Sequence, residues 1–164
     1  GGFRVDPAMQ STDELAGVLR HGKYIKNSTA QYLDDLITST GKIGSKRMSG
    51  QFMYVIDKNG KIIIGTRAGQ HMPHPTLIGG INPQVQGAGI VDIRGGKIFS
   101  INNFSGHYKP DVSSLDAMPN TFGKLPSTAF HKKNRPVPFV FYQATGKTGR
   151  GGGTPKGLIL GGNN

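Results

Sequence analysis

The sequence has no cysteine and no tryptophan among its 164 residues, and it has no apolar run long enough to span a bilayer. Without cysteine, neither a disulfide framework nor a thiolate metal site can form, so the fold is compatible with oxidising and reducing compartments alike. No signal-peptide pattern is visible, and we expect no insertion into a membrane. A chain of this length is typical of one domain, so we expect residues 1–164 to form a single domain.

Acidic side chains are scarce, with 9 aspartates and glutamates against 20 lysines and arginines, and the net charge is +11. Glu14 is the single glutamate of the chain. This balance favours a polyanionic partner such as RNA, DNA, an acidic protein or a phosphate-bearing small molecule, and a merely solubilising basic surface is the alternative. Aromatic residues amount to 8%, so a non-catalytic RNA-binding module with interleaved aromatic and basic side chains ranks below the enzymatic interpretations.

The N-terminal quarter predicts one strand and two helices. The strand covers residues 2–5, and the first helix covers 11–22, where hydroxyl and acidic residues suit the start and Gly22 suits the end. The second helix covers residues 28–41 and is closed by Gly41. Its apolar stripe at helical spacing consists of Tyr32, Leu33, Leu36 and Ile37.

The middle of the chain predicts two β-hairpins. Residues 52–57 and 61–65 flank an Asn-Gly pair, and residues 89–94 and 97–102 flank a Gly-Gly pair. Such pairs supply the positive φ angles that tight turns need. Between the hairpins, residues 65–88 are rich in glycine and proline. A loop of this length inside a domain is usually functional or disordered.

The C-terminal part has a less regular pattern. A short helix is expected after Asp111 and is limited by Pro119, and residues 137–143 predict a strand whose prolines are typical of a sheet edge. Residues 144–157 have the composition of a flexible, basic, glycine-rich segment, and residues 157–160 suit a last strand. The predicted fold class is α+β, with a split antiparallel β-sheet core of short strands and N-terminal helices.

The pair His71 and His74 is the first candidate for a metal site. The two histidines are three positions apart, and Pro73 between them disfavours the helix that would present both to one ion. Zinc needs a third protein ligand, and no cysteine or glutamate lies nearby to complete a site. We therefore expect no metal.

A histidine-based ribonuclease is the alternative enzymatic function. His107 and His131 are candidates for the general acid and base acting on an RNA 2′-hydroxyl, with Lys109 or Lys132 stabilising the charge on the phosphorane. Such an enzyme needs no metal ion. The competing interpretation is that residues 131–133 form a solvated basic turn.

The stretch FRVDPAMQSTDELAGVLRHG, residues 3–22, resembles the opening of ADP-ribosyltransferase toxins. In that family an aromatic-Arg-x-Asp strand precedes a short loop and a helix that ends at glycine. Phe3, Arg4 and Asp6 occupy the matching positions. The resemblance implies that Arg4 binds the phosphate and ribose edge of NAD, and a planar, permanently charged guanidinium suits that task. The second arginine that is usual in the family's loop is absent here.

A second stretch, residues 74–110, is similar to effector domains of bacterial polymorphic toxins of the Rhs and Tc type, some of which are ADP-ribosyltransferases. The segments HPTLIGG, VQGAGIVDIRGGKIFSINN and SGHYKP carry this resemblance. Together the two stretches touch about a third of the chain, and they occur in the order that the family has. The expected fold is therefore ADP-ribosyltransferase-like.

The resemblance implies a division of roles within one NAD site. Tyr108 stacks on nicotinamide and His107 hydrogen-bonds a ribose hydroxyl, so both are predicted catalytic residues. The other predicted NAD-binding residues are Arg4 and Arg67 for the phosphates, His74 and Thr76 beside the nicotinamide, and Ser105 where the backbone approaches closely. A structural role is the alternative for each, since buried histidines and tyrosines commonly just satisfy a hydrogen bond.

The chain departs from the transferase pattern in its catalytic acid. Most such enzymes carry a glutamate on a central strand, where it stabilises the cation formed as nicotinamide leaves. Within residues 88–93, Ile90 takes that position and Asp92 is the nearest carboxylate. Either Asp92 acts as the catalytic acid with a shorter reach, or the acid is dispensed with because the acceptor is a good nucleophile, such as a phosphate or a nucleic-acid hydroxyl.

Both resemblances imply an NAD-dependent ADP-ribosyltransferase, a glycosyltransferase that uses NAD as co-substrate. We expect the excised C-terminal toxin domain of a larger effector used in interbacterial competition, secreted by a system such as type VI secretion and acting in the target-cell cytoplasm. The favoured acceptor is RNA, and protein is second. We also expect a cognate immunity protein with an acidic surface, because the producing cell needs protection and the toxin is basic.

Overall fold

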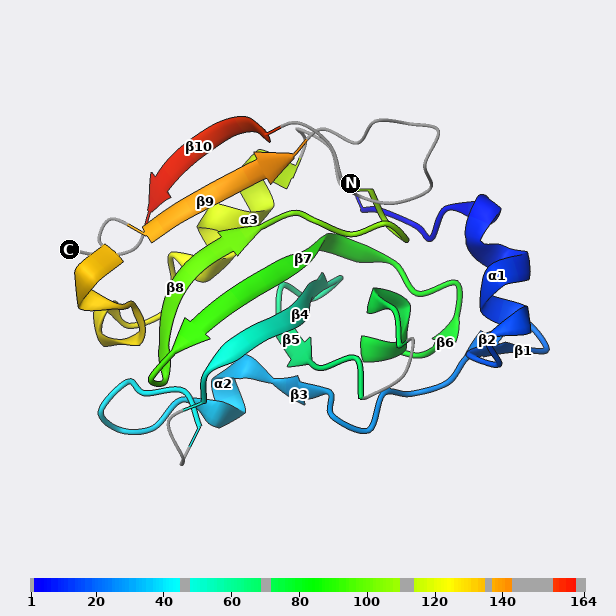
Figure 1. Cartoon of the computed structure of the whole chain (residues 1–164), viewed down its shortest axis with the longest axis horizontal. Coiled ribbons are helices and arrows are strands. Elements are labelled where there is room, and N and C mark those ends of the chain that lie inside the picture. Colours follow the sequence, from blue (N-terminus) through cyan, green and yellow to red (C-terminus); the bar gives the residue numbers. More distant parts are fainter. Residues whose placement is uncertain are drawn as a thin grey trace.

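A computed structural model describes residues 2–44, 48–68, 72–109, 114–134, 137–142 and 155–161. Within these residues the chain forms mostly strands, which are arranged in two sheets, and few helices (Figure 1). The predicted α+β class is confirmed at this level. The helices are short, and the sheets provide the framework on which the candidate site is built.

The larger sheet contains seven strands within the described part of the chain. In spatial order they are β10 (Pro155–Gly161), β9 (Val137–Tyr142), β8 (Lys97–Asn102), β7 (Val85–Arg94), β4 (Gly50–Asp57), β5 (Ile62–Gly65) and β3 (Gln31–Tyr32). Neighbouring strands are antiparallel except β8 and β9, which pair in parallel through Ile101 with Phe139 and Asn102 with Val140. The expectation of an antiparallel core is corrected at this one pair.

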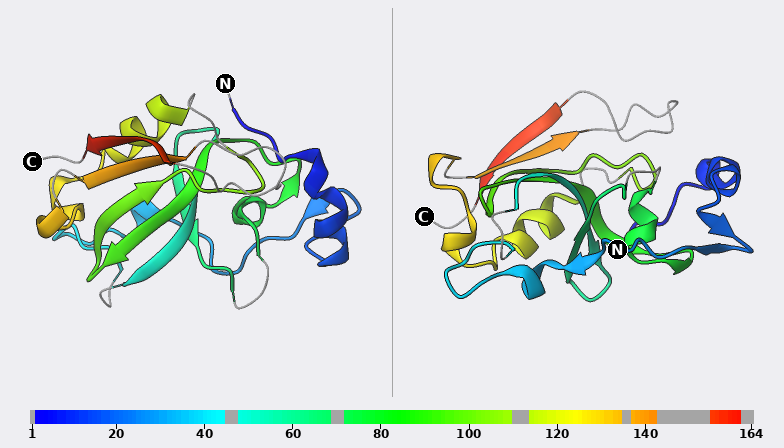
Figure 2. Two further views of the ribbon diagram at one scale, coloured as in Figure 1. Left: turned by 45° about the horizontal axis from the view of Figure 1, so that its top comes forward. Right: turned by 60° about the horizontal axis from the view of Figure 1, so that its bottom comes forward.

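The smaller sheet and the first helix lie together at one end of the molecule, beside the larger sheet (Figure 1, Figure 2). The sheet has the order β1 (Leu19–Arg20), β2 (Lys23–Tyr24) and β6 (Gly80–Ile81). The helix is α1 (Gln10–Leu15). These short elements form one side of the candidate site described below.

Both faces of the larger sheet are buried, which explains the unbroken apolar run in β4. Successive side chains of a strand point to opposite faces, so Tyr54 packs into one hydrophobic core and Val55 into the other. The helix α3 (Ser114–Phe122) covers the first face with Phe122. The 3₁₀ helix η2 (His74–Leu77) covers the second, and its last residue belongs to that core.

Both predicted hairpins are confirmed, as β4–β5 and β7–β8. In the first turn Gly60 has φ 82°, and Oδ1 of Asp57 accepts hydrogen bonds from the backbone N of Asn59 and Lys61 at 2.9 Å each. In the second turn both residues of the Gly-Gly pair have positive φ, 58° and 77°. Two such residues match the twist of the flanking strands.

The predicted helix over residues 11–22 is wrong in its second half, because α1 covers Gln10–Leu15. His21 and Gly22 have φ angles of 52° and 76° and connect β1 to β2. Two consecutive residues with positive φ are typical of a type I′ hairpin turn. Gly22 therefore closes a hairpin and does not end a helix.

The predicted helix over residues 28–41 forms only in part, as the four-residue helix α2 (Leu33–Leu36). The residues before it are held by side-chain hydrogen bonds, since Oδ1 of Asn27 accepts from N and Oγ1 of Thr29 at 2.9 and 2.6 Å. Such local bonds compete with helical pairing. Tyr32, expected on the apolar stripe, belongs to β3 and pairs with β5.

The glycine-rich stretch at residues 65–88 is not one long loop in its described part, because it contains η2, β6 and the start of β7. Glycine weakens the strand signal in a sequence, yet the strand needs it here. A Cβ at Gly89 would lie 1.8 Å from the carbonyl oxygen of Asn102. Gly89 therefore allows a close backbone approach, whereas Gly87 weakens the strand signal of residues 85–88, which lie before the predicted strand.

The C-terminal predictions are confirmed in outline and corrected in detail. The helix α3 contains Pro119 in its interior and does not stop before it. β9 lies between β8 and β10, so its proline, Pro138, does not mark a sheet edge. β10 covers the predicted last strand. Asp111 and residues 143–154, which include most of the predicted flexible segment, lie outside the described residues.

Candidate functional site

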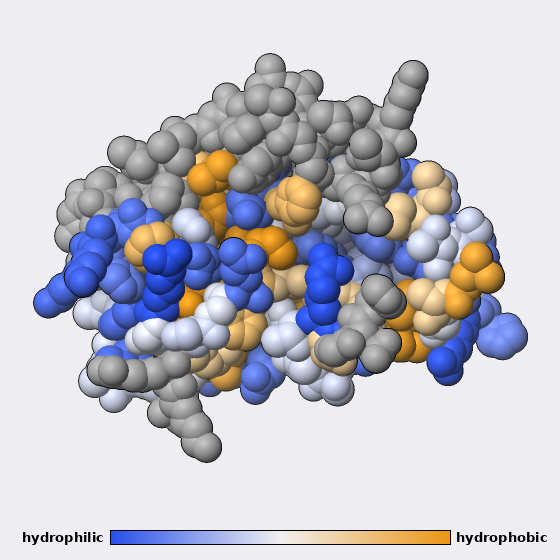
Figure 3. All heavy atoms as spheres, viewed as in Figure 1, coloured by the Kyte–Doolittle hydropathy of each residue, from blue (hydrophilic) through white to orange (hydrophobic). Residues whose placement is uncertain are grey.

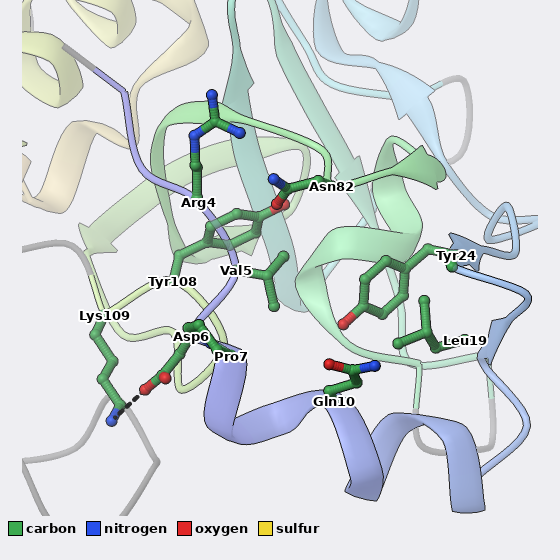
Figure 4. Close-up of a pocket in the computed structure, with 11 residues that line it drawn as sticks. Arg4, Val5, Asp6, Pro7, Gln10, Leu19, Tyr24, Asn82, Tyr108 and Lys109 are labelled. Carbon is green, nitrogen blue, oxygen red and sulfur yellow. Dashed lines mark ion pairs between the residues drawn. The ribbon is translucent and has the colours of Figure 1, made fainter.

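A pocket of about 690 Å³ lies between the N-terminal segment, the β1–β2 hairpin and the turn at residues 105–109 (Figure 4). This volume is in the range of about 300–1,000 Å³ that is typical of small-molecule sites. Charged, amide and phenolic side chains share its wall with apolar ones. The polar residues that line the pocket include Arg4, Asp6, Tyr24, Asn82, Tyr108 and Lys109.

The turn that carries His107 and Tyr108 is shaped by Ser105. Oγ of Ser105 accepts from the backbone N of Tyr108 at 3.3 Å, and its carbonyl oxygen accepts from N of Lys109 at 2.8 Å. Ser105 itself is buried, so it shapes the turn and does not line the pocket. The backbone N of Asp6 donates to the carbonyl oxygen of His107 at 2.8 Å. This bond joins the two stretches that the sequence analysis assigned to one site.

Arg4 is placed at the pocket by a single β-bridge. Of the strand predicted over residues 2–5, the structure keeps one bridge between Phe3 and Val85, with N···O distances of 2.6 and 3.0 Å. Phe3 and Val5 pack against the core of the second sheet face. Because side chains alternate along extended backbone, Arg4 points the other way and is exposed. In Figure 4 its guanidinium extends past the Tyr108 ring, away from Tyr24.

Asp13, His107 and Tyr24 form a hydrogen-bonded group in which Tyr24 lines the pocket and the other two residues do not. Nε2 of His107 donates to Oδ1 of Asp13 at 2.8 Å and lies 3.0 Å from Oδ2, and the Tyr24 hydroxyl donates to Oδ2. Asp13 is only 3% exposed. Burial, and next the hydrogen bond and charge of Asp13, raise the pKa of Tyr24 well above its usual value, so its hydroxyl stays a donor. The group connects α1, β2 and the turn after β8.

Tyr108 forms a fixed part of the pocket wall. Its hydroxyl donates to the carbonyl oxygen of Pro83 at 2.8 Å, and burial raises its pKa well above the usual value. Next to it, Nζ of Lys109 lies 2.8 Å from Oδ2 of Asp6 (Figure 4). The hydrogen bond from Lys109 is the main cause that lowers the pKa of Asp6 below its usual value, so the carboxylate is ionised at neutral pH. Among the described lining residues, the pocket wall therefore carries two cations, Arg4 and Lys109, and one anion, Asp6.

His74 and Thr76 do not line this pocket, because they are buried under the second sheet face. Nε2 of His74 donates to the carbonyl oxygen of Gly89 at 2.8 Å, and Oγ1 of Thr76 donates to that of Pro73 at 2.7 Å. Burial lowers the pKa of His74 to about 4, so it is neutral at pH 7. Arg67 is exposed, and its charge contributes to the lowered pKa of His74. These contacts hold η2 against β7.

The structure does not bring Asp92 into the pocket. Asp92 lies on β7, seven positions beyond Val85, which pairs with the N-terminal segment; this corresponds to about 23 Å of extended strand. Oδ2 of Asp92 accepts from Nη2 of Arg94 at 3.1 Å. Glu14 is exposed on α1. Among the described residues that line the pocket, the carboxylate is Asp6.

His107 and His131 do not meet in the structure. The backbone N of His131 donates to Ile98 at the start of β8, whereas His107 follows the end of that strand. Lys132 and Lys133 are exposed in the 3₁₀ turn η4 (Lys132–Asn134), in agreement with a solvated basic turn. His71 lies outside the described residues. Within the described residues, no three histidine, aspartate or glutamate side chains gather where they could hold a metal ion.

Sequence reasoning missed Asp13 and Tyr24. Asp13 has the position of an ordinary acidic residue in the first turn of a helix, and Tyr24 follows a glycine turn. They are 11 positions apart, and in a helix that separation puts two residues on one face but about 16 Å apart along the axis, beyond hydrogen-bond reach. Only the hairpin between them brings the two side chains together, and the sequence was interpreted as a helix there.

Comparison of the chain with known proteins identifies no relative. No protein-family model matches the chain. No curated protein and no solved structure matches it either. In the portion that the structure describes, no helix has the length and apolar character needed to cross a membrane. The site is therefore interpreted from its own geometry and from the resemblances stated above.

Proposed function

We propose that the chain is an NAD-dependent ADP-ribosyltransferase toxin domain and that the 690 Å³ pocket holds NAD. The observation that carries the proposal is that Arg4 and Tyr108, which come from distant stretches of the sequence, line the same pocket. The resemblances of residues 3–22 and 74–110 to such toxins assign these two residues to opposite ends of NAD. On this proposal the larger sheet is an ADP-ribosyltransferase-like core.

The proposed reaction transfers ADP-ribose to a hydroxyl. The bond between C1′ of the ribose and the nicotinamide nitrogen breaks, neutral nicotinamide leaves with the bonding electrons, and the acceptor oxygen bonds to C1′ and releases its proton to solvent water. Arg4 binds the diphosphate, since its charge is permanent and its donors match phosphate oxygens. Tyr108 offers a fixed aromatic face to the nicotinamide ring because its hydroxyl is held by Pro83.

A role of His107 at the ribose requires the sugar to reach past the lining residues, because His107 does not itself line the pocket. Its Nε2 is occupied by Asp13, which fixes the ring and leaves Nδ1 as the nitrogen for a ribose hydroxyl. Asp13 and Tyr24 are then positioning residues, since they act through His107. The proposal gains from this arrangement because a pocket wall held by buried hydrogen bonds is pre-organised for its ligand.

We assign the carboxylate that opposes the positive charge on the ribose to Asp6 and no longer to Asp92. Asp6 lines the pocket, and Lys109 keeps it ionised. An ionised carboxylate near C1′ stabilises the cation that develops as nicotinamide leaves. The remaining predicted NAD residues, His74, Thr76 and Ser105, support the pocket from behind, and Arg67 stays a candidate for the phosphates.

RNA remains the favoured acceptor, and protein is second. The net charge of +11 supports a polyanionic acceptor, because electrostatic attraction to phosphates is independent of sequence. The basic surface also supports an acidic immunity protein in the producing cell. In Figure 3, hydrophilic side chains are spread over much of the described surface on the face shown. Action in the cytoplasm of a target cell is part of the same proposal.

A ribonuclease that uses His107 is the second candidate, and the Asp13–His107 hydrogen bond is the observation in its favour. A carboxylate that orients a histidine is a recurring feature of general-base catalysis. This ribonuclease would need a second histidine beside His107, but His131 lies at the other end of β8 and His74 is buried and neutral. The transferase proposal needs no second histidine.

The decisive experiment incubates the purified chain with labelled NAD and a cell lysate, and then treats portions with ribonuclease or protease. We expect label that disappears with ribonuclease, and Arg4→Ala is expected to lower the labelling by about tenfold or more, since a hydrogen bond to a charged group contributes about 1.5–3 kcal/mol. Arg94→Ala, which removes an exposed arginine from β7, is the matched control. RNA cleavage without NAD, retained in Arg4→Ala, would favour the ribonuclease.

A further inference from the structure

A second hollow of about 430 Å³ lies next to the candidate NAD pocket, and the two share Asn82. The second hollow lies between the β4–β5 turn, the exposed side chain of Tyr32 and the segment before β7. None of the residues predicted from the sequence as part of a site lines it. The residues that line the second hollow include Lys26, Tyr32, Asp57, Lys58, Ile81 and Asn82.

The charge of this hollow is positive. Lys26 and Lys58 line it, and Asp57 is the one carboxylate among its described lining residues. Oδ1 of Asp57 already accepts two backbone hydrogen bonds in the β4–β5 turn. Nζ of Lys26 is held at the rim by a hydrogen bond of 2.8 Å to the carbonyl oxygen of Leu77, which fixes the ammonium group without neutralising it. The hollow is thus suited to a phosphate backbone.

The aromatic side chain of Tyr32 lines the same hollow. Tyr32 is 44% exposed, and Nζ of Lys61 lies 5.8 Å from the centre of its ring. An exposed ring flanked by lysines combines a stacking surface for a base with cations for the adjoining phosphates, which is how single-stranded nucleic acids are held without sequence preference. Exposed Ile81, next to Asn82, adds apolar surface.

The segment between the two hollows is hydrogen-bonded to the wall of the first pocket. Asn82 has φ 43°, a conformation that asparagine tolerates better than most residues. The next residue, Pro83, is buried, and its carbonyl oxygen accepts the hydrogen bond of Tyr108. A strand bound in the second hollow therefore has a fixed position relative to the aromatic wall of the first pocket.

We propose that the second hollow binds a single-stranded polynucleotide, with a base stacked on Tyr32 and phosphates at Lys26 and Lys58, and that it presents the acceptor hydroxyl to the first pocket across Asn82. The role as acceptor site rests on the proposed transferase function. The polynucleotide site itself rests on the charge, the exposed ring and the shape of the hollow.

The test titrates the full chain into a fluorescent 12-nucleotide single-stranded RNA and, separately, into DNA of the same sequence, and follows anisotropy at several salt concentrations. Tyr32→Ala is expected to weaken binding by about tenfold, the effect of one lost base stack. Lys58→Ala is expected to reduce the slope of log affinity against log salt by about 0.7, as for one lost phosphate contact on a single strand. Tyr32→Phe keeps the ring, and Lys124→Ala removes an exposed lysine near α3; both are expected to bind as the native chain does.

Release of nicotinamide from NAD, measured in the same variants, separates this proposal from the function on which it rests. Unchanged release with weakened RNA binding and weakened RNA labelling in Tyr32→Ala supports the acceptor site. Native-like RNA binding by both Tyr32→Ala and Lys58→Ala overturns the site and leaves the transferase intact. If the native chain releases no nicotinamide while Tyr32→Ala still loses RNA affinity, the transferase proposal fails and the polynucleotide site stands. Label found on protein alone overturns the acceptor role.

Discussion

Nε2 of His107 lies 2.8 Å from Oδ1 of Asp13, so a residue of the first helix holds the ring of a residue that follows β8. The same carboxylate accepts the hydroxyl of Tyr24. Since all three side chains are mostly buried, the contact both stabilises the fold and orients the histidine. Folding and site geometry are therefore coupled at Asp13.

Asp13→Asn is expected to lower the free energy of unfolding by about 1–3 kcal/mol, because one of two buried donors then faces an amide NH₂ group and loses its acceptor. The loss is measured by urea denaturation at neutral pH. Glu14→Gln makes the same chemical change at the next position, on an exposed side chain, and is expected to be neutral. Equal stability of the two variants would contradict the buried network.

The stability of the protein is expected to fall as the pH drops from about 6.5 to about 4, through His74. Burial lowers the pKa of His74 from 6.5 to about 4, so in this window the unfolded chain binds a proton that the folded chain does not. At 1.36 kcal/mol per pKa unit the difference amounts to about 3 kcal/mol. The contribution is fully present above pH 6.5 and is lost below pH 4.

His74→Gln tests this pH dependence, since glutamine can donate to Gly89 and does not titrate. Urea denaturation of the variant and the native chain at pH 7 and pH 4.5 should give a smaller loss of stability in the variant. His21→Asn replaces an exposed histidine in the β1–β2 turn and is expected to keep the native pH dependence. The idea fails if the two variants respond to pH alike.

Gly89→Ala is expected to be severely destabilising, by about 3 kcal/mol or more, because the added methyl group overlaps rigid backbone in the sheet. Its Cβ would lie 1.8 Å from the carbonyl oxygen of Asn102. Gly87→Ala is the matched control on the same strand, where the new Cβ would meet only the end of the Ile56 side chain at 3.3 Å. Thermal unfolding by circular dichroism compares the two. Comparable melting temperatures would show that β7 and Asn102 do not approach this closely.

Asp92→Asn is expected to leave NAD-dependent labelling within about twofold of the native level, because Asp92 does not line the pocket. The fold should also be unaffected, since the ion pair of Asp92 with Arg94 is partly exposed and such pairs contribute little to stability. Asp6→Asn removes the carboxylate from the pocket wall and is expected to reduce labelling strongly. Single-turnover labelling with saturating NAD compares the two variants. The opposite ranking would return the catalytic acid to Asp92.

The parts of the fold that the sequence predicts correctly are those with local signals. The β4–β5 and β7–β8 hairpins are marked by turn residues whose positive φ angles the structure contains. The predicted helix over residues 28–41 forms only in part because the side chains of Asn27 and Thr29 hold a turn at residues 28–29 in place of helical pairing. The first helix ends early because Gly17, with φ 77°, closes it, and the glycine at the predicted end, Gly22, belongs to the β1–β2 turn.

The site is predictable only where a resemblance or a charge marks it. Arg4 and Tyr108 stand out in the sequence and line one hollow, whereas His107, which also stands out, does not line it and is hydrogen-bonded to Asp13. Asp13 and Tyr24 do not stand out, because their roles come from contacts that a hairpin and a long connection create. The second hollow combines Lys58 of a turn with Tyr32 of another strand, and no local pattern encodes such a meeting.

The parallel pairing of β8 with β9 has a consequence for the pocket. Antiparallel neighbours can be joined by a two-residue turn, but parallel neighbours require a connection that returns along the length of the sheet. The connection after β8 begins with the turn that carries His107 and Tyr108. The sheet thus requires the segment that supplies part of the pocket wall, and a chain shortened there would lose both its strand order and that wall.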